Sequence, residues 1–220
     1  MSCSRTESEL FPCKLVEASR LIREGYPIST YNHRFNLPDQ RHPWDLEQFR
    51  LGYACFKREV AKVLQPKIIL EIGVGIGISA MAFMDACPSS YYLGIDSDVE
   101  SGRDFPVQPS LFVYKLLASK SYSFDILKLD SQKMNSVPAV PDFVHIDACH
   151  SRKATEHDVT LAWNALAPSG FILVDDARDS NVSAGTFDAL AKLHPGSIDW
   201  TYFEDTWTGS ILIHREQSRP

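Results

Sequence analysis

Short apolar segments alternate with helical segments from Lys67 to the end of the chain, and this alternation constrains the fold more than any other feature of the sequence. The apolar segments predict strands at residues 68–72, 91–95, 124–129, 142–146 and 171–174. Helical patterns cover residues 79–86, 109–118, 152–166 and 187–193. Continuous apolar strands connected through helices are typical of a parallel sheet covered on both faces. Two further strands, 200–204 and 210–214, predict a C-terminal antiparallel hairpin. The sequence therefore predicts an α/β fold with a doubly wound, mostly parallel sheet.

Composition excludes several classes of function. The 220 residues carry a formal net charge of −6, whereas a nucleic-acid-binding surface needs a basic face. No apolar run approaches the ~18 residues of a membrane span, and the N-terminus lacks the basic and apolar parts of a secretory signal. The five cysteines form no C-x-x-C pair, which favours a reducing compartment. We therefore expect a cytoplasmic protein with no nucleic-acid or membrane partner.

The first 65 residues differ from the rest of the chain. Helical spacing covers residues 14–24 and 44–64, and the segment between them is irregular and rich in aromatic side chains. That segment contains Tyr26, Tyr31, His33, Phe35, His42 and Trp44. A long loop in a compact domain is often functional, so these residues could form a lid over a substrate, a packing seam or a dimer contact. We expect an N-terminal helical lid segment (1–65) and a catalytic domain (66–220), with homo-oligomerisation possible.

An acidic residue stands at the end of every parallel strand. These residues are Glu71, Asp96, Asp130, Asp147 and the pair Asp175–Asp176. The carboxyl ends of parallel strands meet at one edge of a sheet, which is where ligands bind in doubly wound folds. One such acid is an ordinary helix cap, but five strand ends in succession predict a functional cluster.

A glycine-rich loop follows the first strand. Gly73, Gly75 and Gly77 have the spacing G-x-G-x-G, whereas a dinucleotide-binding loop has G-x-G-x-x-G and would need glycine at Ile78. Asp96, at the end of the next strand, suits the two hydroxyls of a ribose. A ribose site without a pyrophosphate loop points away from NAD.

The segment 71–77, Asp96 and the C-terminal hairpin together resemble the class I S-adenosylmethionine-dependent methyltransferases over residues 67–215. The resemblance implies a seven-stranded Rossmann-like sheet with an antiparallel last strand. It also implies that Glu71 and the loop of Gly73, Gly75 and Gly77 border the methionine part of S-adenosylmethionine. Asp96 would then hold the ribose, Asp130 and Ser131 would flank the adenine, and Asp147 would also border the cofactor.

Residues 144–150 and 166–176 carry a narrower resemblance, to the O-methyltransferases of macrolide-sugar, rhamnosyl and cephalosporin pathways. Those enzymes bind a divalent metal through acids at the positions of Asp147, Asp175 and Asp176. The catechol methyltransferases have an amide in place of the second acid of the pair and a lysine at the position of His150, so this chain departs from them.

Chemistry agrees with such a metal site. Clustered carboxylates repel one another unless a cation lies among them, and hard oxygen ligands favour Mg²⁺, Mn²⁺ or Ca²⁺ over zinc, with Mg²⁺ the expected ion. A chelated hydroxyl of a small-molecule substrate becomes more acidic, and His150 could act as the base that removes its proton. His145 lies within a buried strand pattern, so we expect a core residue there rather than a ligand.

We therefore predict an S-adenosylmethionine-dependent O-methyltransferase that acts on a small, natural-product or sugar-like molecule with the assistance of a divalent metal. Two alternatives remain at this point. One is a metal-free N- or O-methyltransferase, and the other is a nucleotide-binding oxidoreductase or binding module on the same fold.

Overall fold

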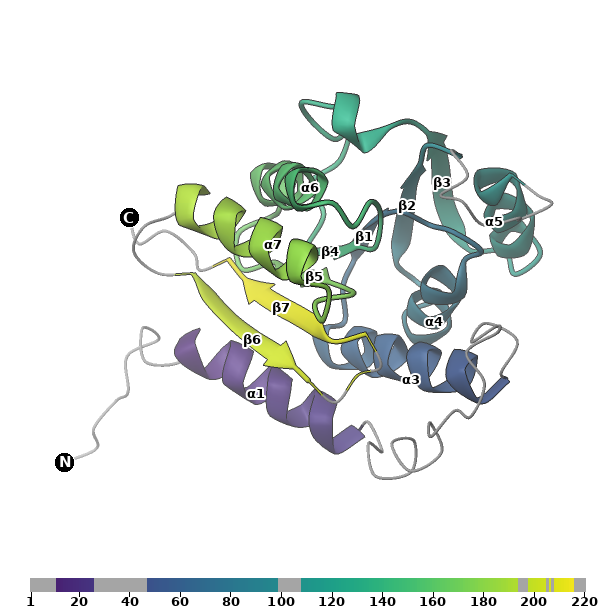
Figure 1. The fold of residues 1–220 in the computed structure, drawn as a ribbon. Helices are drawn as coiled ribbons and strands as arrows, with labels where there is room; N and C mark the ends of the chain where they lie inside the picture. The colour runs from purple at the N-terminus through teal and green to yellow at the C-terminus, as the bar shows by residue number, and fades with distance from the viewer. Residues whose placement is uncertain are drawn as a thin grey trace, which may run out of the picture.

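A computed structural model describes residues 11–25, 47–98, 108–193, 198–204, 206 and 208–215. These residues form one sheet in the order β3-β2-β1-β4-β5-β7-β6 (Figure 1). Its strands are β1 (Ile68–Ile72), β2 (Tyr91–Asp96), β3 (Ser123–Lys128), β4 (Phe143–Ile146), β5 (Phe171–Val174), β6 (Asp199–Phe203) and β7 (Ser210–His214). The first five are parallel, and β7 is antiparallel to both β5 and β6. The prediction of a mostly parallel, seven-stranded sheet with a C-terminal antiparallel hairpin is confirmed.

Helices cover both faces of this sheet (Figure 1). One face packs against α1 (Phe11–Gly25), α3 (Glu47–Leu64), α4 (Ile78–Ala86) and α5 (Pro109–Ala118). The other packs against α6 (Arg152–Ala165) and α7 (Ser180–Leu193). Successive strand residues point to opposite faces, so Ile69 belongs to the first core and Leu70 to the second. The strands are apolar throughout because both of their faces are buried.

Helix α7 begins at Ser180 rather than at residue 187. Its first turns contain Ser, Asn, Gly and Thr residues, which have low helix propensity and suggest a loop in the sequence. Val182 and Thr186 are nevertheless buried where α7 packs on α6. Tertiary packing therefore overrides local propensity here.

The N-terminal helices belong to the same core as the sheet. Phe56 and Val60 of α3 are buried in one cluster with Ile69 and Phe83. Helix α1 lies beside β6 and α3 (purple in Figure 1), and Arg23 donates a hydrogen bond of 2.9 Å to the Tyr202 carbonyl. The same core therefore contains residues from both sides of position 65. The aromatic residues between Tyr26 and Trp44 lie outside the described residues, so their role as a lid, a packing seam or a dimer contact stays a prediction. None of the described helices has the length and apolar composition that crossing a membrane requires.

The turn after β1 brings Gly73 against the end of β4. Gly73 has φ +88°, and a Cβ atom there would lie 2.2 Å from the backbone oxygen of Asp147. Gly75 has φ +47°, and nothing lies within 4 Å of the place its Cβ would take. Close packing and backbone conformation therefore both favour glycine at position 73, whereas only the backbone conformation favours it at position 75.

We expect Gly73→Ala to lower the free energy of unfolding by about 2–5 kcal/mol, because left-handed strain and a backbone clash act together. Gly75→Ala is the matched control and should cost about 1–2 kcal/mol, from strain alone. Urea denaturation of both variants measures the difference. Equal losses would show that the contact with Asp147 does not limit this turn.

Candidate active site

A cavity of about 590 Å³ opens at the carboxyl ends of the parallel strands. It lies over the junction of β1 and β4, where the order of the strands reverses, and this is the expected place for a ligand in such a sheet. Its walls include these residues: Tyr53, Gly73, Val74, Gly75, Ser79, Asp96, Asp130, Ser131, Gln132, Asp147, Cys149, His150, Asp176 and Thr208. Most of the residues predicted from the sequence therefore line one space.

Asp96 organises the loop after β1. Its Oδ2 accepts hydrogen bonds from the backbone N–H groups of Val74 (3.0 Å) and Gly75 (3.1 Å). Gly73 and Gly75 present backbone to the cavity, and the space beside Gly75 is open. Gly77 behaves differently, because a Cβ there would meet Val113 of α5 at 2.9 Å and Gly77 is not among the cavity-lining residues. We therefore assign Gly77 to packing rather than to a ligand.

The segment after β3 forms another wall. Asp130 caps the short 3₁₀ helix Ser131–Lys133 through a 3.1 Å hydrogen bond from the Gln132 N–H. The Gln132 side chain donates a 2.8 Å hydrogen bond to Asp158 on α6. Burial raises the pKa of Asp158 to about 6. Sequence reasoning found Asp130 and Ser131 but missed Gln132, which lines the cavity beside them.

Glu71 is not where the resemblance implied. Its side chain is 1% exposed and lies beneath the strand ends, outside the cavity wall. One carboxylate oxygen accepts a hydrogen bond from the Tyr92 hydroxyl, and the other lies 2.8 Å from His145 Nδ1. Strand alternation explains the placement, since residue 71 points to the face covered by α3 and α4. Glu71 supports His145 and is not among the residues that line the cavity.

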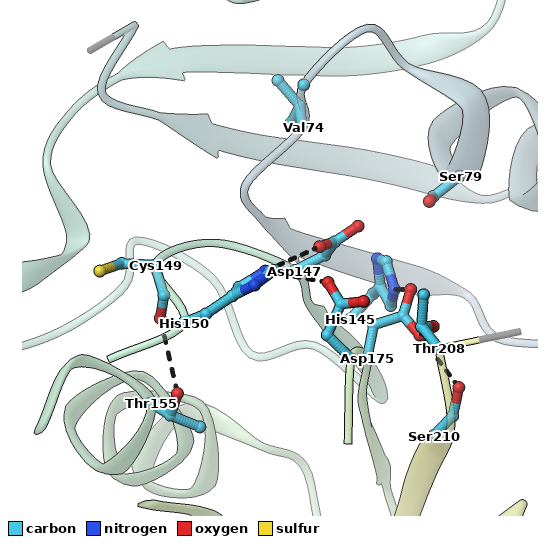
Figure 2. A network of polar contacts seen from close by, with 12 residues as sticks. Val74, Ser79, His145, Asp147, Cys149, His150, Thr155, Asp175, Thr208 and Ser210 are labelled. Carbon is cyan, nitrogen blue, oxygen red and sulfur yellow. Dashed lines mark hydrogen bonds and ion pairs between the residues drawn. The ribbon is translucent and has the colours of Figure 1, made fainter. Parts of the chain in front are cut away.

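Asp147, His150 and Asp176 meet at the other side of the cavity. His150 Nε2 lies 3.8 Å from Asp147 Oδ1 (Figure 2). The same atom lies 2.9 Å from Asp176 Oδ2. The Tyr53 hydroxyl of α3 donates a 2.7 Å hydrogen bond to Asp147 Oδ2. Asp176 has φ +52°, a left-handed conformation that is uncommon for a residue with a side chain. This conformation turns its carboxylate toward His150 rather than along the strand.

Charge pairing shifts the protonation of this cluster. The carboxylates of Asp147 and Asp176 raise the pKa of His150 to about 10. Burial would raise the pKa of Asp147, but the hydrogen bond from His150 and the positive charge of Lys57 outweigh it and hold this pKa well below its usual range. Burial and the neighbouring carboxylates raise the pKa of Asp176. At neutral pH His150 is therefore an imidazolium between two acids.

Asp175 is closed off from the cavity. Its Oδ2 accepts a 2.7 Å hydrogen bond from the buried Lys57 ammonium. Its Oδ1 accepts hydrogen bonds from the hydroxyls of Thr208 (2.8 Å) and Ser210 (3.0 Å), as Figure 2 shows. Sequence reasoning missed Lys57. Its spacing from Tyr53 and Val60 (i, i+4, i+7) places it on the apolar stripe of α3, and that position was the available signal.

The three acids expected to hold a metal thus fall into two overlapping groups. Asp147, His150 and Asp176 offer ligand atoms within 4.8 Å of one another at the cavity, and His145, Asp147 and Asp175 do so in the interior. Because both oxygens of Asp175 are engaged by other side chains, the acids that face the cavity for a divalent cation are Asp147 and Asp176. His145 is a core residue with both ring nitrogens in contact with polar partners, as the sequence predicts.

Comparison with known proteins agrees with this geometry. Residues 70–177 match the model of a family described as a methyltransferase domain. No curated protein sequence matches the chain. Among solved structures, the methyltransferase PaMTH1 of Podospora anserina, bound to S-adenosylhomocysteine, has a TM-score of 0.59 at 14% identity and aligns over 99% of this chain and 100% of its own.

Two further solved structures are O-methyltransferases. The one from Bacillus cereus, in complex with S-adenosylhomocysteine, has a TM-score of 0.54 at 18% identity and aligns over 90% of this chain and 91% of its own. TomG from Streptomyces achromogenes, in complex with S-adenosylmethionine, has a TM-score of 0.53 at 18% identity and aligns over 93% of this chain and 96% of its own. At these identities the solved structures establish the fold.

The domain match decides against the oxidoreductase and binding-module alternatives. Residues 70–177 match a methyltransferase domain, and the chain shares the fold of solved methyltransferases that bind S-adenosylmethionine or S-adenosylhomocysteine.

Proposed function

We propose that this methyltransferase acts on a hydroxyl oxygen of a small molecule of natural-product or sugar-like type, and that a divalent cation such as Mg²⁺ assists it. The observation that carries the proposal is the cluster of Asp147, His150 and Asp176 in the same cavity as Gly73, Gly75 and Asp96. Two carboxylates suit a hard cation with room for substrate oxygens. TomG, one of the O-methyltransferases that share the fold, is described as involved in tomaymycin synthesis, and this adds weight to an oxygen acceptor.

The residues of the cavity divide into two parts. Gly73, Gly75 and Asp96 would hold the methionine and ribose parts of S-adenosylmethionine, and the segment Asp130–Gln132 would lie against its adenine. When bound, this cofactor supplies a methyl group on a positively charged sulfur. Asp147, His150 and Asp176 would face the acceptor. Holding both reactants in one cavity replaces an encounter in solution by a fixed approach, which is a large part of such a rate enhancement.

His150 is the candidate base. Its Nε2 would take the proton that the hydroxyl loses as the oxygen bonds to the methyl carbon and the carbon–sulfur bond breaks. An imidazolium must first lose its own proton to do so. A divalent cation held by Asp147 and Asp176 would acidify a coordinated hydroxyl. The two carboxylates that would bind the cation are the ones that now stabilise the imidazolium. Binding of the cation would therefore replace the positive charge of His150 and favour loss of its proton.

A metal-free transfer is the second candidate, and one observation favours it. Lys57 neutralises Asp175, and His150 lies between Asp147 and Asp176. The acids are thus compensated by the chain itself. In this case the same cavity would bind acceptor and cofactor, and activity would persist in EDTA.

Calorimetry of the EDTA-treated protein tests the proposal. We expect S-adenosylhomocysteine to bind with a Kd on the order of 1–100 μM and Mg²⁺ to give a separate signal. Asp176→Asn should abolish the Mg²⁺ signal and leave the binding of S-adenosylhomocysteine unchanged. Asp130→Asn is the matched control at the β3 side of the cavity. It should weaken the binding of S-adenosylhomocysteine and leave the binding of Mg²⁺ unchanged.

A screen of vicinal diols with S-adenosylmethionine then identifies the methylated atom by mass spectrometry. Methylation of nitrogen acceptors alone would contradict an oxygen acceptor. Full activity in EDTA would select the metal-free candidate.

The raised pKa of His150 predicts a pH-dependent stability in EDTA. The folded-state pKa of about 10 lies above the ordinary value of 6.5. The contribution of His150 to stability is therefore complete below about pH 6.5 and is lost as the pH rises through about 10. The difference in free energy of unfolding between the wild type and His150→Gln should shrink over this range. NMR titration of the imidazole checks the cause, since Asp176→Asn should lower its midpoint; a wild-type midpoint near 6.5 would contradict it.

A further inference from the structure

Lys57 lies in the protein interior at the centre of a set of metal-type ligands. Its side chain is completely buried, and its Nζ lies 2.7 Å from Asp175 Oδ2 and 3.0 Å from His145 Nε2. The same atom lies 4.6 Å from the centroid of the Tyr53 ring. Fully buried lysines are rare and need a partner, and this one has a carboxylate, an imidazole and an aromatic face.

The groups around Lys57 would suit a metal ion. His145, Asp147 and Asp175 each offer one ligand atom, and these atoms lie within 4.8 Å of one another. A histidine with two carboxylates is a donor set for Zn²⁺, Mn²⁺ or Co²⁺. We call these three residues the inner set.

His145 is also oriented as a metal ligand would be. Its Nδ1 lies 2.8 Å from Glu71 Oε1, so an Nδ1–H donated to this carboxylate leaves the Nε2 lone pair facing Lys57. Metal-binding histidines usually donate their second ring N–H to a carboxylate or carbonyl in this way. The carboxylate–histidine pair is thus present, with an ammonium where a metal would be.

We propose that the Lys57 ammonium is the resident cation of the inner set and keeps divalent metal out of it. A cation fixed to α3 needs no ion from solution and ties this helix to the ends of β4 and β5. It leaves Asp147, which belongs to both groups, and Asp176 for the divalent ion of the proposed function. The inference holds for the inner set even if that function fails, so its test measures cation binding and not methyl transfer.

Lys57 also acts as a positioning residue. Tyr53 stands one helical turn before it on α3, and the Tyr53 hydroxyl donates to Asp147. Asp175 directly precedes Asp176 in the chain and is held at both oxygens. Anchoring Lys57 therefore sets both carboxylates of the cavity, one through Tyr53 and one through the backbone of Asp175.

The test compares Lys57→Ala with Lys62→Ala, a surface lysine of the same helix whose side chain is 44% exposed. The EDTA-treated proteins are titrated with Co²⁺, followed by visible absorption, calorimetry and melting temperature. We expect Lys57→Ala to melt lower than the wild type in EDTA, because it leaves a buried carboxylate without its cation. It should gain a site for one Co²⁺ that binds at least tenfold tighter than in the wild type, and Co²⁺ should restore its melting temperature.

A double variant distinguishes the effect of the lost Lys57 charge from the effect of the space that its side chain leaves. Lys57→Ala/Asp175→Asn removes both charges, so it should melt higher than Lys57→Ala in EDTA and lose the tight Co²⁺ site. Lys62→Ala should behave as the wild type in both measurements. If Lys57→Ala does not fold in EDTA, recovery of folded protein on refolding with Co²⁺, but not with EDTA, supports the inference equally.

Three results would overturn it. One is a folded Lys57→Ala whose Co²⁺ affinity equals that of the wild type. Another is a Lys57→Ala that is as stable as the wild type in EDTA. The third is a Lys57→Ala that stays unfolded with Co²⁺ while the double variant is no more stable.

Discussion

The ion pair between Lys57 and Asp175 is the interaction on which the rest of the site depends. Neither side chain has more than 1% exposure. Removing two charges from water is costly, and such a pair persists only where further hydrogen bonds complete it. Here Thr208 and Ser210 complete Asp175, and His145 completes Lys57. The partners come from α3, β4, β7 and the turn before β7, so one ammonium joins the helical layer to the centre and the antiparallel side of the sheet. Loss of either partner alone would leave an uncompensated charge in the core.

Strand alternation explains on which face of the sheet these charges are buried. The residues of β1, β4 and β5 alternate between the two cores, and the positions of Glu71, His145 and Asp175 fall on the face that α3 and α4 cover. Asp176 would continue the alternation toward α6 and α7. Its left-handed backbone breaks that pattern and brings the carboxylate to His150. Sparsely populated conformations of this kind cost free energy and occur where the surroundings hold them in place. Here Asp175, which directly precedes the strained Asp176, is held at both of its carboxylate oxygens.

Much of the fold could be predicted from the sequence, because buried parallel strands are read directly from apolar runs; the bounds of β1 and β5 agree residue for residue. The start of α7 could not, since only its packing on α6 makes a Ser- and Thr-rich segment helical. The acids at the strand ends correctly located the cavity. Their roles were harder to assign, because an acid at a strand end can point to the cavity, as Asp147 does, or to the core, as Glu71 and Asp175 do. That choice depends on a partner far away in the sequence, and Lys57 is more than a hundred residues from Asp175.

Asp147 joins the two halves of the cavity. Its backbone oxygen is the atom against which Gly73 packs, so it fixes the glycine-rich loop to which the proposed function assigns the cofactor. Its N–H donates a 2.9 Å hydrogen bond to the Ile72 carbonyl, which ties the end of β4 to the end of β1. Its carboxylate belongs to the group with His150 and Asp176, to which the proposed function assigns the acceptor. A displacement of Asp147 would therefore move both sides of the cavity together and keep the distance between them constant. Because transfer between two bound molecules depends steeply on their separation, a shared reference residue at the switch point of the sheet gives this fold a direct physical advantage for the reaction.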